Sequence, residues 1–357
     1  MNKSFREINK EVTEYTRENR KEQEKILDQQ KENSEFIGVV RNRTVEEFPK
    51  LFHKKAEVER MTSKAILQND VIKIAFEPKY SNKQVIQVTT HKLLTCALYE
   101  LTKQNNKNSK EINNKIYIPL EEYAAACGYS KDDGFRNLRK LVNKDLRVLY
   151  DANITIKETI KNQVRDYVDM RLVTQKGIKR GCIYIKFDDE VAKSLIDQGI
   201  ITQYPKTLFK IDGRHRAAYS LALKMIEQYS NINNHLSKSK NYNKLSVDSL
   251  LKQVGISTDT KACKKKGWRT AAQEPLENAL EYLVQIGYLS DYHYKSHEAL
   301  SDDQLVDWTT CAQWKKDIIV FELAKENELS NITQKAIQRR KENKKKNEKK
   351  RKSSGTV

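Results

Sequence analysis

Residues 120–149 read LEEYAAACGYSKDDGFRNLRKLVNKDLRVL and carry two hydrophobic patterns of helical period around a glycine. The first pattern has apolar residues at i, i+3, i+4 and i+7, namely Leu120, Tyr123, Ala124 and Cys127. Gly128 follows, where a helix C-terminus favours glycine. The second pattern places these residues on one side of a longer helix: Phe135, Leu138, Val142 and Leu149, with Leu146 flanking them. The stretch therefore predicts two helices joined by a tight turn.

Regular elements are expected on both sides of this pair. Upstream, Thr90 is suited to cap a helix striped by Leu93, Leu94, Ala97, Leu98 and Leu101, and residues 116–118 form a short strand. Downstream, apolar residues alternate at 168–172 and 183–187, which predicts two strands joined through Gly177 to Gly181. The predicted order is helix, strand, helix, turn, helix, hairpin.

The same order recurs in residues 218–323. Ala218, Leu221, Ala222, Met225, Ile226 and Tyr229 stripe a first helix, and a short helix from Val247 to Val254 is capped by Ser246 and ended by Gly255. A third helix has Pro275 in its first turn and is expected to turn Leu276, Leu280, Leu283 and Ile286 inward. Residues 288–294 and 318–323 supply the closing strands.

A second and a third helix that are joined by a tight turn and followed by a hairpin describe a winged helix. In a winged helix the third helix enters the DNA major groove. The plain alternative is two small α+β domains without that role. We therefore predict an α+β protein with tandem winged-helix domains and charged, partly disordered N- and C-terminal tails. The expected divisions are a charged N-terminal helical extension (1–60), a first domain (61–205), a second domain (206–330) and a basic disordered tail (331–357).

The charge of the chain makes a polyanion the first partner to consider. The 357 residues hold 67 Lys and Arg against 48 Asp and Glu, a net charge of +19. Residues 335–352 alone contribute +9, which suits nonspecific phosphate binding, although the segment could also merely keep the protein in solution. No apolar run is long enough for a membrane span, and the polar start lacks a signal-peptide core. The richness in Lys, Asn and Ile favours a bacterial source, so we expect a cytoplasmic, nucleoid- or plasmid-associated protein.

The third helix of the first domain is the main candidate for DNA contact. Arg136, Lys140, Asn143 and Arg147 lie on the face opposite its apolar side, with Arg139 beside them. Arg can bond guanine, Asn can bond adenine, and Lys can neutralise phosphate, although solubility alone also produces such a stripe. The hairpin tip adds Lys176, Lys179 and Arg180 where a wing would follow the backbone.

In the second domain the positive charge precedes the third helix. The candidate contacts are Lys261, Lys264, Lys265, Lys266 and Arg269, with Trp268 among them. The third helix itself exposes Glu277, Asn278, Glu281 and Gln285, and its two carboxylates would repel phosphates. The connection from Ser296 to Trp314 is acidic, which fits a solvated loop or a protein-facing surface better than a DNA-facing wing.

No catalytic or metal site is predicted. The five cysteines lie far apart without a CxxC pair, which indicates reduced, mostly buried thiols. The rival hypothesis is a rolling-circle initiator that nicks DNA with a tyrosine and a metal, but the chain has no His-x-His pair, and His293 and His297 do not share a helix face. A phosphate-binding GxxxxGK[ST] loop is also lacking, so we expect no enzyme activity and no cofactor.

The sequence resembles the plasmid replication initiators that bind origin repeats through two winged-helix domains. The similarity rests on Thr89, Thr90 and His91 at the start of the first helix, and on residues 187–201 running into Tyr204, Pro205 and the helix from Arg214. It covers about residues 65–325. The resemblance implies binding to double-stranded origin repeats as a monomer, repression of its own gene as a dimer bound to an operator, opening of AT-rich DNA, and recruitment of host helicase or initiator proteins. A winged-helix repressor without a replication role remains an open alternative.

Overall fold

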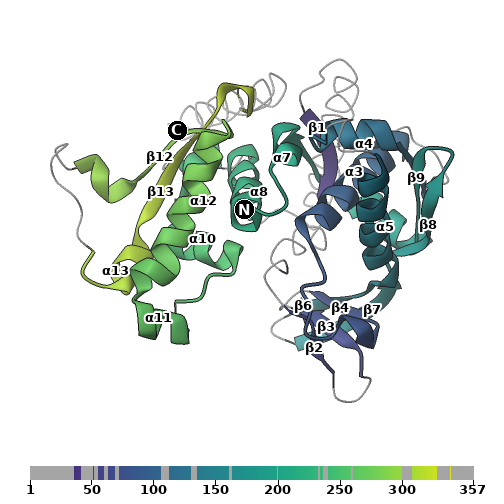
Figure 1. Ribbon diagram of the computed structural model, residues 1–357, viewed down its shortest axis with the longest axis horizontal. Helices are drawn as coiled ribbons and strands as arrows, with labels where there is room; N and C mark the ends of the chain where they lie inside the picture. The colour runs from purple at the N-terminus through teal and green to yellow at the C-terminus, as the bar shows by residue number, and fades with distance from the viewer. Residues whose placement is uncertain are drawn as a thin grey trace, which may run out of the picture. The chain divides into compact units, whose positions relative to one another are not determined.

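The computed structural model describes two compact units (Figure 1). Its described residues are 36–41, 51, 55–59, 63–68, 72–105, 112–129, 135–160, 163–198, 200–231, 234–235, 240–258, 260–299, 308–327 and 338. Unit 1 comprises the described residues of Met1–Glu46, Gln68–Pro78 and Lys92–Lys206. Unit 2 comprises those of Glu47–Leu67, Lys79–His91 and Thr207–Val357. The basic segment 335–352 and most of the predicted N-terminal extension lie outside the described residues.

In unit 1, three of the described helices accompany a three-stranded antiparallel sheet in the order β5-β9-β8. The helices are α3 (Val88–Asn105, of which residues from Lys92 belong to this unit), α4 (Leu120–Ala126) and α5 (Phe135–Asp151). The strands are β5 (Lys115–Pro119), β8 (Val173–Lys179) and β9 (Cys182–Phe187). Alternate residues of β5 and β9, including Ile116 and Ile185, are fully buried on the helix side of this sheet.

A second set of strands in unit 1 was not predicted, apart from the strand expected at residues 168–172, which overlaps β7. β4 (Ile72–Phe76), β6 (Asn153–Ile160) and β7 (Gln163–Arg171) pair antiparallel in that order, and β1 (Phe36–Arg41) pairs with β10 (Ile200–Pro205) beside α6 (Asp189–Gln198). The expected hairpin between residues 168–172 and 183–187 is therefore wrong, because β7 pairs with β6 and the partner of β9 is β8. Residues 36–41, expected within a helical extension, form a strand instead.

Unit 2 is built from three larger helices and a sheet in the order β11-β13-β12. The helices are α8 (Arg216–Ser230), α10 (Val247–Val254) and α12 (Glu274–Gln285), and the strands are β11 (Lys244–Ser246), β12 (Leu289–Tyr294) and β13 (Ile318–Leu323). Shorter elements are β2 (Glu57–Val58), β3 (Ala65–Gln68), η2 (Pro78–Tyr80), α7 (Thr207–Lys210), η3 (Asn241–Asn243), α11 (Lys261–Lys266), the π-helical turn η4 (Arg269–Gln273), η5 (Lys295–Ala299), α13 (Cys311–Lys316) and η6 (Lys325–Asn327).

The two units repeat one order of elements. Each has a helix, a strand, two further helices and two final strands, and in each sheet the last strand lies between the other two. In unit 1 the β6–β7 hairpin is inserted between the third helix and the final strands. The predicted repetition of helix, strand, helix, turn, helix and hairpin is thus confirmed, with that insertion added.

Glycine ends the second helix of each unit, as the sequence predicts. Gly128 and Gly255 have φ of 73° and 71°, in the left-handed region that favours glycine. The next residue in each case donates its backbone N–H five residues back, from Tyr129 to Ala124 and from Ile256 to Leu251. These bonds satisfy helix carbonyls that would otherwise lack a partner, and they turn the chain toward the third helix.

Two details of the predicted helices are wrong. α3 begins at Val88, so Thr90 lies inside the helix and is buried instead of capping it. Ile286 follows the last residue of α12 and is 42% exposed, whereas Leu276, Leu280 and Leu283 are fully buried. The prediction that Ile286 faces inward is wrong because the chain leaves the helical path at this residue. The helical period that places Leu283 inward therefore no longer applies to Ile286.

Candidate nucleic-acid interface

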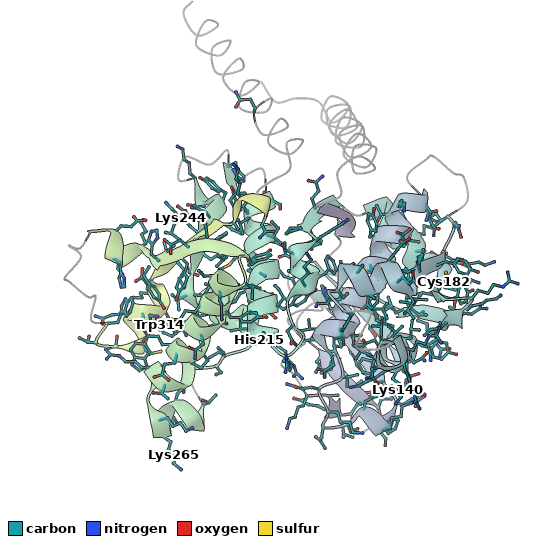
Figure 2. The ribbon with its side chains drawn as sticks, turned by 45° about the horizontal axis from the view of Figure 1, so that its top comes forward. Lys140, Cys182, His215, Lys244, Lys265 and Trp314 are labelled. Atoms are coloured by element: carbon teal, nitrogen blue, oxygen red, sulfur yellow. The ribbon has the colours of Figure 1, made fainter. Side chains whose placement is uncertain are left out.

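The exposed side of α5 carries the row of basic and amide side chains predicted from its sequence. Leu138, Val142, Leu146 and Leu149 are buried, which fixes how the helix is turned on unit 1. The opposite face exposes the predicted residues Arg136, Arg139, Lys140, Asn143 and Arg147, and Figure 2 labels Lys140. The side chain of Phe135 lies outside the described residues. We call these five exposed residues together with Lys144 the α5 row.

Lys144 belongs to the α5 row because it is exposed and lies four residues after Lys140 and three before Arg147. Among the described residues, no member of the row is held in an ion pair or a side-chain hydrogen bond. The row therefore presents five cations and one amide whose bonding capacity remains available to a ligand. That inventory fits contacts to phosphates and base edges together.

The β8–β9 hairpin ends in a two-residue turn at Arg180 and Gly181, with φ of 50° and 77°. Two consecutive residues of positive φ make the tight turn that suits a twisted hairpin. Lys179 and Arg180 are exposed there, so the structure places these two predicted residues at the tip. Lys176 is not at the tip, because the turn is shorter than the expected Gly177-to-Gly181 connection and β8 continues to Lys179.

Lys176 lies instead beside the C-terminal end of α5. Its Nζ is 5.3 Å from the ring centroid of Tyr150, and Arg171 Cζ is 4.2 Å from the same centroid. Arg171 Nε also donates to the Tyr150 carbonyl oxygen at 3.4 Å. Sequence reasoning missed these contacts, because only the fold brings Arg171 of β7 and Lys176 of β8 to Tyr150 of α5.

In unit 2 the predicted basic cluster precedes α12. Lys264, Lys265 and Lys266 are exposed on α11, and Lys265 extends outward from this helix in Figure 2. Thr260 caps α11 by accepting the Cys263 N–H at 3.2 Å. Arg269 is also exposed, whereas the side chain of Lys261 lies outside the described residues. The structure thus brings four of the five predicted cations to one short segment.

Aromatic packing and hydrogen bonds attach this basic segment to the rest of unit 2. The ring centroids of Trp268 and buried Trp314 are 5.2 Å apart, and Arg269 Nη2 donates to the Trp308 carbonyl oxygen at 3.0 Å. Trp308 Nε1 in turn donates to Asp317 at 3.2 Å. These contacts link the approach to α12 with the connection between β12 and β13.

The carboxylates of α12 and of the following connection have mainly structural partners. Glu277 Oε1 accepts from Gln273 Nε2 and from the hydroxyl of Tyr294, each at 2.9 Å. Glu281 remains exposed. The predicted acidic residues of the connection at positions 302, 303 and 307 lie outside the described residues. The exposed face of α12 is therefore less suited to phosphates than the α5 row.

The histidines do not assemble into a metal or catalytic centre within the described part of the chain. His293 is 3.1 Å from Glu298, and the ring of His297 stacks on Trp308. His91 is buried, with its Nδ1 hydrogen-bonded to the Tyr219 hydroxyl at 2.9 Å, and burial lowers its pKa to about 3. Across the residues described, no three His, Cys, Asp or Glu side chains gather in a way that could hold a metal ion.

The five cysteines are all free in the structure. Cys127 and Cys263 are buried, whereas Cys96, Cys182 and Cys311 are half-buried, so the expectation that most are buried is wrong. Burial raises the pKa of the Cys127 thiol to about 11, which keeps it protonated near neutral pH. None of the helices in the described ranges combines the length and apolar character needed to cross a membrane.

The segment that carries the α5 row matches a known protein family. Residues 64–223 match the family model described as Initiator Replication protein, WH1. This segment of the chain matches the plasmid replication initiator family. The resemblance found in the sequence is thereby confirmed for this segment, and the family implies DNA binding. A comparison with curated proteins found no match.

The family match extends from just before β3 into α8, so it contains α3, α4, α5 and the β8–β9 hairpin. The domain that the family model names is a winged-helix domain. The first of the two predicted winged helices is therefore supported by sequence comparison as well as by element order. The matched segment thus includes α5, whose basic face has no partner among the described residues.

Proposed function

We propose that this initiator binds double-stranded DNA in a sequence-dependent way at repeats of a plasmid origin, and that the α5 row is its main reading surface. The observation that carries the proposal is this row of five cations and Asn143, which have no side-chain partners among the described residues and lie on the third helix of the matched winged-helix segment. A third helix of this kind enters the major groove, where Arg and Asn side chains distinguish bases.

A second winged helix in unit 2 would extend this contact along the duplex. Its support is the repeated element order and the matching sheet order of the two units. Lys264, Lys265, Lys266 and Arg269 would meet phosphates beside α12, since the exposed carboxylate of Glu281 disfavours deeper approach of that helix. We assign the domains 61–205 and 206–330 to these two roles.

We propose the remaining initiator steps on the basis of the resemblance to this family. They are opening of AT-rich origin DNA, recruitment of host helicase or initiator proteins, and repression of the protein's own gene as a dimer. We propose that the protein performs them by binding alone, without cutting DNA. Incubation of supercoiled origin DNA with the protein and Mg²⁺ or Mn²⁺ should leave the DNA unnicked, and a metal-dependent covalent protein–DNA adduct would overturn this part of the proposal.

Single substitutions in the α5 row test the reading surface. Asn143→Ala or Arg147→Ala should cost about 1 to 3 kcal/mol of binding free energy and relax preference at particular base pairs. Lys140→Ala should weaken binding to all sequences alike, because a phosphate contact carries no base information. Lys193→Ala is the matched control, since Lys193 is an exposed lysine of unit 1 on α6. The reading surface is disproved if the row variants bind origin DNA as the control does.

Footprinting tests the two-domain arrangement. Two third helices that reach one side of a duplex need sites about one helical turn apart, or roughly 10 base pairs. The whole protein should therefore protect two patches at that spacing, and substitution of Lys264, Lys265 and Lys266 by Gln should weaken one of them. A single protected patch would remove the second winged helix from the DNA interface.

A genetic test separates an initiator from a repressor. A plasmid that carries only this gene and its flanking DNA should replicate in a suitable host. Failure to replicate, together with repression of a reporter joined to the same flanking DNA, would favour the repressor.

A further inference from the structure

The outer face of the β5-β9-β8 sheet presents two tyrosines that the hydrophobic core does not use. Tyr117 on β5 and Tyr184 on β9 are directly opposite in the antiparallel register, with ring centroids 5.0 Å apart and ring planes inclined by 37°. Tyr117 is 51% exposed, which is unusual for so large an aromatic side chain in a strand, and Tyr184 is half-buried. Both point away from the buried isoleucines of the same strands. Cys182 marks the hairpin end of β9 in Figure 2.

The surface beside Tyr184 is open on the β8 side. Gly177 is the residue of β8 that pairs with Tyr184, and a Cβ placed on it would meet nothing within 4 Å. The hydroxyl of Tyr184 donates to Gln175 Oε1 at 2.8 Å, which holds the ring over the sheet. A planar ligand could therefore lie against the Tyr184 ring without displacing a side chain of β8.

Lysines flank the two rings. Lys115 and Lys186 form the next pair on the same face of β5 and β9, two residues from the tyrosines, and within the described residues neither takes part in an ion pair. The sequences of the three strands contain no Asp or Glu. The nearest carboxylates after β9 are engaged, because Asp188 accepts the backbone N–H of Glu190 and Asp189 accepts from the side chain of Asn114. The face thus combines aromatic rings with two lysines that form no ion pair among the described residues.

We propose that this tyrosine face, made of Lys115, Tyr117, Gly177, Tyr184 and Lys186, binds single-stranded nucleic acid. Every nucleobase has a planar π-face that stacks on an aromatic ring, and lysines beside the ring attract the adjoining phosphates. A duplex hides those faces inside its own stack, so the tyrosine face has no use for paired bases. A sheet with exposed aromatic side chains is also a surface on which other proteins stack unpaired bases.

The inference rests on the proposed function, since an opened origin would supply the unpaired strand. It assigns duplex and unpaired DNA to different surfaces of unit 1. The α5 row would hold duplex DNA, and the tyrosine face would hold an unpaired segment. The two surfaces therefore predict opposite responses to substitution, which makes them separable by experiment.

Binding of the full chain to labelled oligothymidylate of about ten nucleotides, followed by fluorescence anisotropy, tests the proposal. Tyr117→Ala and Tyr184→Ala should each weaken binding by about 5- to 100-fold, the loss expected for one stacked base. Tyr117→Phe and Tyr184→Phe keep the ring and should stay within about two-fold of the unsubstituted protein. Gly177→Val adds bulk beside Tyr184 at a position where a Cβ meets nothing within 4 Å, and it should also weaken binding.

Duplex origin DNA provides the matched arm. Asn143→Ala should weaken duplex binding and leave oligothymidylate binding unchanged, whereas Tyr117→Ala should do the reverse. If Tyr117→Ala weakens both ligands equally, the face is part of the duplex interface and the proposal is overturned. If oligothymidylate binds equally well to the Ala and Phe variants, base stacking on this face is refuted even when duplex binding by the α5 row is intact.

A cross-linking measurement on the unsubstituted protein avoids any effect of substitution on folding. An oligonucleotide that carries 5-iodouracil should cross-link on irradiation to the peptides containing Tyr117 or Tyr184. Cross-links confined to α5 or to α11 would place the single strand elsewhere and overturn the assignment.

Discussion

Buried His91 should make the stability of unit 2 depend on pH in a defined window. The folded protein keeps this imidazole neutral, since burial lowers its pKa to about 3 from the ordinary value of 6.5. Above pH 6.5 the side chain is neutral in both the folded and the unfolded chain. As the pH falls below 6.5, the unfolded chain binds a proton that the folded chain does not, so stability is lost until the pH reaches the folded pKa.

The expected loss between about pH 8 and pH 5 is about 2 kcal/mol, because an unfolded histidine gains 1.36 kcal/mol for each pH unit below its pKa. This window lies above the range in which Asp212 of unit 2 contributes. The hydrogen bond from the Arg214 side chain lowers the pKa of Asp212 to about 2. Asp212 therefore loses its stabilising effect only as the pH falls below the ordinary carboxyl pKa near 4.

Urea unfolding followed by tryptophan fluorescence measures this effect. The chain has three tryptophans, at positions 268, 308 and 314, and all three belong to unit 2, which also contains His91. His91→Gln removes the titrating group and should reduce the loss of stability between pH 8 and pH 5 by about 2 kcal/mol, whatever its stability at pH 8. His293→Gln, which removes a more exposed histidine of the same unit, should keep the full pH dependence. Equal losses in the unsubstituted protein and in His91→Gln would refute the reasoning.

Three other predictions concern helix ends, the core and the basic segment. Ser246→Ala should destabilise unit 2 by about 1 kcal/mol in the same urea assay, because the Ser246 side chain accepts the Ser249 N–H; an unchanged midpoint would mean that this cap contributes nothing. Leu280→Ala should cost about 2 to 5 kcal/mol, since Leu280 is fully buried on α12, and a loss below 1 kcal/mol would show that the core closes around the cavity. Replacing the lysines of 335–352 by Gln should reduce the slope of log affinity against log salt by about 0.9 for each phosphate that the segment no longer binds. The preference for particular DNA sequences should not change. An unchanged slope would indicate that the segment does not touch DNA.

The helices were predictable because their signals are local. The spacing of Leu276, Leu280 and Leu283 marks a buried face of α12, and Gly255 marks the end of α10 without knowledge of any distant residue. Strand pairing is different. The alternation in residues 168–172 predicts a strand, but alternation does not identify its partner, and the short connection from Ile160 to Gln163 pairs β7 with β6.

The same distinction applies to the candidate interface. The α5 row follows from the period of one helix, so five of its six exposed members could be named from sequence. The position of Lys176 depends on the length of a turn, and its approach to Tyr150 depends on the packing of β8 against α5. The tyrosine face was missed because Tyr117 and Tyr184 are distant in sequence and become neighbours only through the register of β5 and β9.

The connections between the last two strands of each unit differ in how much change in length they can absorb. In unit 1 only Arg180 and Gly181 separate the paired residues Lys179 and Cys182, so one inserted residue would shift the register and exchange the two faces of the sheet. In unit 2 the β12–β13 connection runs from Lys295 to Asp317, and its described residues include the short helices η5 and α13. A longer connection accepts added residues at little entropic cost. The β12–β13 connection is therefore the place to graft an epitope or a fluorescent label, and it is where we expect natural variants of this protein to differ in length.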